Sequence, residues 1–266
     1  MEKEVVSMAA TKSELTPMQR QYFQIKEQNQ DSILFFRLGD FYEMFNEDAI
    51  VAAKELDLTL TTRDRNKPKE EQTPMCGVPF HSVDSYIARL VNRGYKVAIC
   101  EQTSDPAATK GLVEREITRI VTPGTVTESC MLDESKNNYM ACLYGQGNRY
   151  GLAFCDVSTG AFYATICADS QTAASELGRF APSEVIRGGN GVDDAILNDA
   201  LFHRLNCCVD EGKPQQFDLE QSQSLLESHF EQPLSQLGLT GMPETIIACG
   251  TLLQALLFVQ KNDLMF

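Results

Sequence analysis

The spacing of apolar residues in the first 125 positions switches between the helical and the strand period. A hydroxyl residue followed by proline, Thr16-Pro17, predicts a helix that starts there and runs to about residue 29. Residues 32–38 are almost wholly apolar and stop at Gly39-Asp40, which predicts a central strand followed by a turn. The same patterns predict helices over 47–56 and 82–93 and strands over 58–62, 95–101 and 114–121. Such alternation is typical of a compact mixed α/β unit.

The pattern changes after residues 129–138, an acidic and polar stretch that is the best linker candidate. Three closely spaced strands are expected next, over 139–144, 150–157 and 160–167. Helices and strands then alternate, with helices over 171–180, 193–201 and 244–260 and strands over 184–187 and 206–209. We therefore predict a first domain over residues 1–128 and a second α/β domain over residues 139–260.

The composition is that of an ordinary soluble globular protein, with 43% hydrophobic and 23% charged residues. No apolar run reaches the roughly 18 residues that a membrane helix needs, and the acidic N-terminus lacks the basic region of a signal peptide. We therefore expect no membrane contact and a cytoplasmic location. The nine cysteines never occur as Cys-x-x-Cys, so we expect reduced core thiols and no metal site.

The net charge of −14 argues against nucleic acid at first sight, because excess Lys and Arg normally supply phosphate binding. The charge is unevenly distributed, however. Residues 1–128 carry 16 basic against 20 acidic residues, whereas residues 129–266 carry 7 against 17. Any contact with a polyanion is therefore expected in the first half, and the acidic second half should face protein.

Aromatic and acidic residues alternate over residues 40–45, directly after the turn, where a loop is normally small and polar. Composition alone favours burial of these aromatic rings in the core. The alternative is that Phe41 is an exposed wedge that enters the minor groove and unstacks a base step, which is easier at a mismatch. Phosphates would repel Glu43 unless it hydrogen-bonds a base or takes up a proton, so it would penalise matched DNA.

The segment 36–45, Phe-Arg-Leu-Gly-Asp-Phe-Tyr-Glu-Met-Phe, resembles the Phe-x-Glu signature of the MutS family of bacterial DNA mismatch repair proteins. Further blocks resemble successive segments of that family in the same order, at 73–81, 97–102, 105–107 and 119–125. The resemblance implies a mixed-sheet mismatch-binding domain followed by an RNase H-like connector domain, with residues 261–266 beginning the lever domain. It also implies that Phe41 stacks on the mispaired or unpaired base, that Glu43 hydrogen-bonds that base, and that the duplex is kinked.

Four basic residues crowd the segment 63–69, and a solvated turn is the ordinary interpretation of such a loop. The resemblance favours phosphate contact instead, chiefly by Arg63. Met75 and Arg119 resemble further family positions near DNA, although methionine is more often a packing residue. The full set of candidate DNA-binding residues is Phe41, Glu43, Arg63, Arg65, Asn66, Lys67, Met75 and Arg119.

A nuclease is the main enzymatic alternative, because Asp156 at a strand end resembles the first carboxylate of an RNase H-like enzyme. Two-metal cleavage needs several converging carboxylates, and the sequence alone does not bring Asp193, Asp194 or Asp199 to Asp156. The family's connector domain is RNase H-like and does not cleave. The chain also lacks the Gly-x-x-x-x-Gly-Lys-Ser/Thr phosphate loop. We therefore expect no catalysis and no cofactor in this chain.

Recognition of mispaired and unpaired bases for DNA mismatch repair is the function that the resemblance implies. It also implies a full-length homodimer whose C-terminal ATPase domain binds ATP and Mg. The expected partners are mismatched double-stranded DNA and a MutL-type repair protein that contacts the connector domain, at a cytoplasmic, nucleoid-associated location. The competing interpretation is a structural or scaffolding fragment, in which Phe41 lies in the core and the charged loop is inert.

Overall fold

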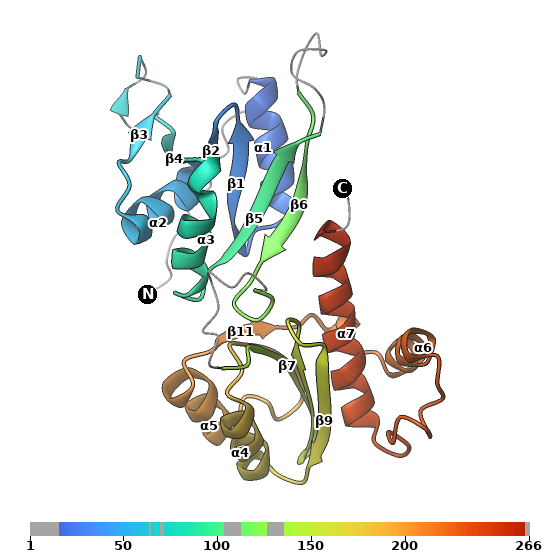
Figure 1. Ribbon diagram of the computed structural model, residues 1–266. Coiled ribbons are helices and arrows are strands. Elements are labelled where there is room, and N and C mark those ends of the chain that lie inside the picture. The colour runs from blue at the N-terminus through green and yellow to red at the C-terminus, as the bar shows by residue number, and fades with distance from the viewer. Residues whose placement is uncertain are drawn as a thin grey trace.

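Two β-sheets, each covered by helices, follow one another along the chain (Figure 1). The computed structural model describes residues 16–263 with the exception of 64, 67, 70–71, 104–112 and 127–135. Both sheets mix parallel and antiparallel strands. The prediction of an α/β chain with two mixed-sheet units is therefore confirmed.

The first sheet has six strands in the order β3-β4-β2-β1-β5-β6. Their bounds are β1 (Ser32–Leu38), β2 (Phe41–Phe45), β3 (Thr61–Thr62), β4 (Pro74–Pro79), β5 (Lys96–Gln102) and β6 (Arg115–Val121). β1 runs parallel to β5, and the other neighbouring pairs are antiparallel. β1 is central, as its apolar run predicted, and Leu34, Phe35 and Phe36 are fully buried in it.

Helices cover both faces of this sheet. α1 (Pro17–Gln28) begins with the expected cap, because the Thr16 hydroxyl accepts the backbone N–H of Gln19 and the Gln19 side chain accepts the backbone N–H of Thr16. Its Tyr22 is buried against one sheet face. On the opposite face pack α2 (Asn46–Leu56) and α3 (Val83–Val91), the latter preceded by the 3-10 turn η2 (Phe80–Ser82).

The second sheet has five strands in the order β11-β10-β7-β8-β9. Their bounds are β7 (Tyr139–Gln146), β8 (Arg149–Asp156), β9 (Ala161–Cys167), β10 (Glu184–Gly189) and β11 (Cys208–Glu211). β8 is antiparallel to both of its neighbours, while β7, β10 and β11 run parallel to one another. This is the arrangement expected of an RNase H-like domain.

One face of the second sheet is covered by α4 (Ser170–Phe180), α5 (Ala195–Asn198) and the π-helical turn η3 (Asp199–Arg204). The other face is covered by α6 (Leu219–Phe230) and α7 (Pro243–Asp263), after the 3-10 turn η4 (Pro214–Gln216). α7 also contacts β6 of the first sheet, so one helix packs against both units (Figure 1).

A cluster of charged residues around Lys96 of β5 joins the two units. The Lys96 ammonium lies 3.5 Å from Oε1 of Glu184 and 3.6 Å from Asp31, and it also pairs with Asp210. Glu184 is fully buried, and its Oε2 accepts the N–H of Gly124 at 3.0 Å. Burial raises the pKa of Glu184, and the Lys96 charge opposes that shift. The contact between the units therefore includes a buried ion pair.

Several elements differ from the sequence predictions. Residues 41–45 form β2, although the sequence indicated only the end of a strand before them. The strand expected over 58–62 is reduced to β3, and the helix expected over 193–201 divides into α5 and η3. Ser82 precedes α3 as predicted but makes no side-chain cap hydrogen bond, because η2 leads into the helix. β4 and α6 were not predicted.

Most of the predicted linker, residues 129–138, lies outside the described residues, as does the block at 105–107. Within the part of the chain that the structure describes, no helix combines the length and apolar character that crossing a membrane requires.

Candidate nucleic-acid interface

The hairpin between β1 and β2 turns through Gly39 and Asp40. Gly39 has a φ of +60°, which glycine adopts without a steric penalty. Nε of Arg37 donates to the Gly39 carbonyl at 2.5 Å, and the N–H of Phe80 donates to the Asp40 carbonyl at 3.0 Å. The turn is thereby held from two directions, and Phe41, the first residue of β2, has a fixed position.

Side chains of β2 alternate between the two faces of the first sheet. Tyr42 and Met44 are buried among the residues beneath α2 and α3. Phe41 and Glu43 lie on the opposite face, where α1 covers only the end of the strand, at Phe45. The side chain of Phe41 is 48% exposed. Burial in the core is therefore confirmed for two of the three aromatic rings, those of Tyr42 and Phe45, and is wrong for Phe41.

Glu43 forms an ion pair with Arg63, the residue that follows β3. Nη2 of Arg63 lies 2.8 Å from each carboxylate oxygen and donates a hydrogen bond to Oε1. The Glu43 side chain is 14% exposed and the Arg63 side chain 45%. Among the described residues, Oε2 of Glu43 has no hydrogen-bond donor in good geometry, so one buried acceptor is left over.

Gly77 of β4 lies directly opposite Glu43 in the sheet. A Cβ atom there would stand 3.2 Å from the carbonyl oxygen of Tyr42 and 3.5 Å from Cγ of Glu43. The glycine therefore leaves the sheet surface open beside the carboxylate. We did not select Gly77 from the sequence, although a glycine inside a strand is a signal for close approach of another backbone.

The other candidate DNA contacts are dispersed over the sheet. Arg65 and Asn66 are exposed in the turn after β3, while Lys67 lies outside the described residues. Met75 of β4 is half-buried and packs at the edge of the cluster beneath α1. Arg119 lies on β6, with β1 and β5 between it and β2. The structure therefore separates Arg119 from Phe41 and Glu43 by two strands of the sheet.

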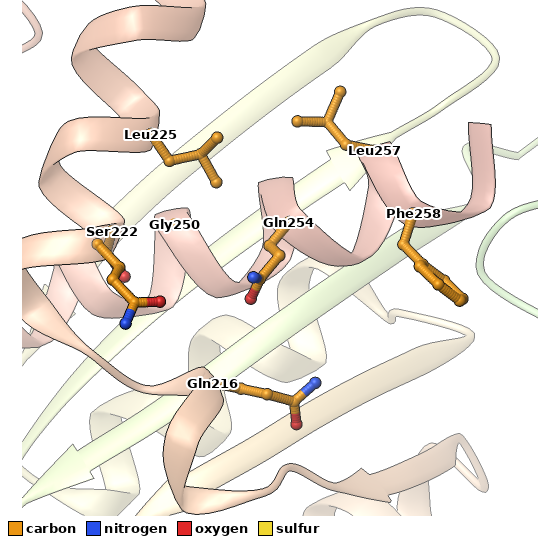
Figure 2. Close-up of a pocket in the computed structure, with 8 residues that line it drawn as sticks. Gln216, Ser222, Leu225, Gly250, Gln254, Leu257 and Phe258 are labelled. Atoms are coloured by element: carbon orange, nitrogen blue, oxygen red, sulfur yellow. The ribbon is translucent and has the colours of Figure 1, made fainter. Parts of the chain in front are cut away.

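Exposure alone does not distinguish Phe41, because Phe258 of α7 is 61% exposed. Phe258 borders a cavity of about 440 Å³ between α6, α7 and η4 (Figure 2). Gln254 and Gln216 line this cavity, and no acid, base or thiol is among its described lining residues. The cavity offers no group for acid–base or covalent catalysis. Phe41 differs from Phe258 in having a charged pair beside it.

The nuclease alternative requires carboxylates that converge on Asp156. Asp156 is buried, and its Oδ1 accepts the N–H and the hydroxyl of Ser158 at 3.0 and 2.6 Å. Asp194 caps α5 instead. Among the described residues, the one group of three potential metal ligands is Glu184, Cys208 and Asp210. Lys96 already pairs with two of these, and Asp156 has no such cluster within the described chain.

Comparison with known proteins gives matches to both units. The family model of MutS domain I matches residues 16–130, and that of MutS domain II matches residues 138–265. The DNA mismatch repair protein MutS of Ruminiclostridium cellulolyticum is 48% identical over 94% of this chain and 28% of its own length. Those of Acetivibrio thermocellus and Methanococcoides burtonii are 47% and 42% identical, again over 94% of the chain. The chain spans 28 to 29% of the length of these relatives.

The two mixed sheets and the order of the two matches define a mismatch-binding domain followed by a connector domain. The chain belongs to the MutS family of DNA mismatch repair proteins.

Proposed function

We propose that this chain recognises mispaired and unpaired bases in duplex DNA for mismatch repair. In this proposal Phe41 enters from the minor groove as a wedge, Glu43 hydrogen-bonds the displaced base, and the duplex kinks at that step. The observation that carries the proposal is the exposed ring of Phe41 on the same sheet face as Glu43, at the start of a firmly held strand. Family membership supports the same function.

The wedge can discriminate because unstacking a base step costs a few kcal/mol on sound duplex and less where pairing is already weak. A ring on a strand, close to a turn held by two hydrogen bonds, loses little conformational freedom on insertion. Oε2 of Glu43 pairs with Nη2 of Arg63 at 2.8 Å without accepting a hydrogen bond in good geometry, so it becomes an acceptor for a base N–H when Arg63 moves away. On matched DNA the base edges are already paired, so Glu43 finds no base donor that could replace its ion pair with Arg63.

The test is a fluorescence anisotropy titration of a full-length MutS protein that carries this sequence as its first two domains. Phe41→Ala is expected to weaken binding to a G·T heteroduplex roughly tenfold to hundredfold, the usual loss when a stacking aromatic is truncated. Affinity for the matched duplex should change by less than about twofold, because non-specific binding rests on phosphate contacts.

Phe23→Ala is the matched control, since Phe23 of α1 is another exposed phenylalanine of the same unit. It should leave both affinities unchanged. Equal, Phe41-independent binding of the two duplexes would contradict the proposal and favour a structural fragment.

We infer the remaining properties from family membership alone. The domains are a mismatch-binding domain over residues 1–128, a linker over 129–138, a connector domain over 139–260 and a lever domain that starts at 261. The full-length protein forms a homodimer and has an ATPase domain, outside this chain, that uses ATP and Mg. A MutL-type protein binds at the connector domain. Arg65, Asn66, Lys67, Met75 and Arg119 remain proposed DNA contacts.

A further inference from the structure

Two contacts hold Arg63 on the face of the first sheet that carries Phe41 and Glu43, so its side chain does not project freely into solvent. Its Nη2 atom lies 2.8 Å from each of the two carboxylate oxygens of Glu43. The centre of its guanidinium group lies 5.9 Å from the ring centroid of Phe45, the next residue on the same face of β2. Guanidinium groups stack on aromatic faces and bind carboxylates in a fixed geometry, so both contacts suit Arg and neither fully suits Lys.

The ion pair changes what Glu43 presents to DNA. The side chain of Glu43 is largely covered, while that of Arg63 is the more exposed partner. An approaching phosphate therefore meets the outer edge of the guanidinium before it meets the carboxylate. No other cation pairs with Glu43 among the described residues, although the first half of the chain is acidic overall. Without Arg63 the carboxylate would face phosphate uncompensated.

We propose that Arg63 is a specificity-determining residue that acts as the counter-charge of Glu43. This deepens the proposed function and rests on it. While the pair is intact, Glu43 is neutralised and the protein can approach any duplex. At a mispaired base the carboxylate accepts a hydrogen bond from the base edge and the guanidinium is released to the DNA backbone, so Glu43 gives up its ion pair only where a base donates to it. Arg63 is thus a positioning residue, in addition to any phosphate contact of its own.

A double-mutant cycle on matched duplex tests the proposal in the full-length protein at low, fixed salt. If Arg63 compensates Glu43, Glu43→Gln should change the matched-duplex Kd by less than about twofold in the wild type. In the Arg63→Gln background the same substitution should tighten binding by about fivefold or more, because it then removes an unpaired charge. Equal gains in the two backgrounds would overturn the proposal, since they would make Arg63 an independent phosphate contact.

Arg65→Gln is the matched control, because it removes the same charge two positions away at an exposed residue without an ion pair among the described side chains. Its effect should add to that of Glu43→Gln without coupling. Compared with Arg63→Gln, Arg63→Lys should restore most of the matched-duplex affinity and only part of the coupling energy with Glu43. If it restores neither, the Arg63 variants have lost structure and the proposal fails. Phe41→Ala tests the wedge separately. If Phe41→Ala abolishes the preference for the mismatch while Glu43 and Arg63 show no coupling energy, only the proposed role of Arg63 is rejected.

Discussion

Lys96→Met is expected to destabilise the folded chain by about 3 kcal/mol at pH 8, because it leaves a buried carboxylate without its cation. Glu184 is fully buried, where it accepts the N–H of Gly124 and interacts with the Thr122 hydroxyl and the Lys96 ammonium. Asp210 and Asp31 also face the site, so removal of the ammonium leaves three acidic groups together. Urea unfolding of the 266-residue chain would measure the loss.

The loss should depend on pH in a defined direction. Burial already holds the pKa of Glu184 above its ordinary value of 4.5, and removal of the Lys96 charge raises that pKa further. Between pH 4.5 and the raised pKa of Glu184, the folded variant binds more protons than the unfolded chain. Its free energy of unfolding therefore falls as the pH rises through this range. Lys96→Met should therefore be closer to wild type at pH 5 than at pH 8. The pKa of Lys96 is also raised, and this changes the stability of the wild type only above pH 10.5, the ordinary pKa of a lysine.

Two further variants identify the cause. Lys54→Met removes an exposed lysine of α2 and should change stability by less than about 0.5 kcal/mol at either pH. Adding Glu184→Gln to Lys96→Met should recover part of the loss at pH 8, because it removes the buried charge. A loss that is the same at both pH values, and unaffected by Glu184→Gln, would show that Lys96 contributes only packing.

The elements that the sequence predicted are those whose signals are local. The cap at Thr16, the apolar run of β1 and the three strands that begin at Tyr139 depend on neighbouring residues. β2 was missed because it is short and starts directly after a turn. Its pattern becomes clear only when Tyr42 and Met44 are seen to fill the core beneath α2.

The candidate site was predictable only in part. Composition alone favoured a buried Phe41, and the family signature was needed to favour an exposed one. The pair between Glu43 and Arg63 was not predictable, because β3, β4 and β2 must assemble before residues 20 apart meet. The contact of Lys96 with Glu184 depends in the same way on how the two units pack. Long-range ion pairs leave no periodic signal in a sequence.

Gly151→Ala is expected to destabilise the chain by about 3 kcal/mol, because α7 begins directly against β8. A Cβ atom at position 151 would lie 2.1 Å from the carbonyl oxygen of Glu244 and 2.5 Å from the backbone nitrogen of Thr245. These are backbone atoms in the first turn of α7, so no side-chain rotation can relieve the overlap. The whole start of the helix must move away from the sheet.

Gly178→Ala makes the same chemical change where nothing lies within 4 Å, on the exposed side of α4. Alanine is the better helix former by about 1 kcal/mol, so this control should stabilise the chain. The two substitutions should thus shift the urea midpoint in opposite directions. α7 packs on the second sheet and also on β6, so displacement of its start should loosen the contact between the units as well. Hydrogen exchange would detect this as faster exchange of the β6 and β8 amides in Gly151→Ala than in the wild type. Unchanged protection of β6 would contradict a role for α7 in holding the two units together.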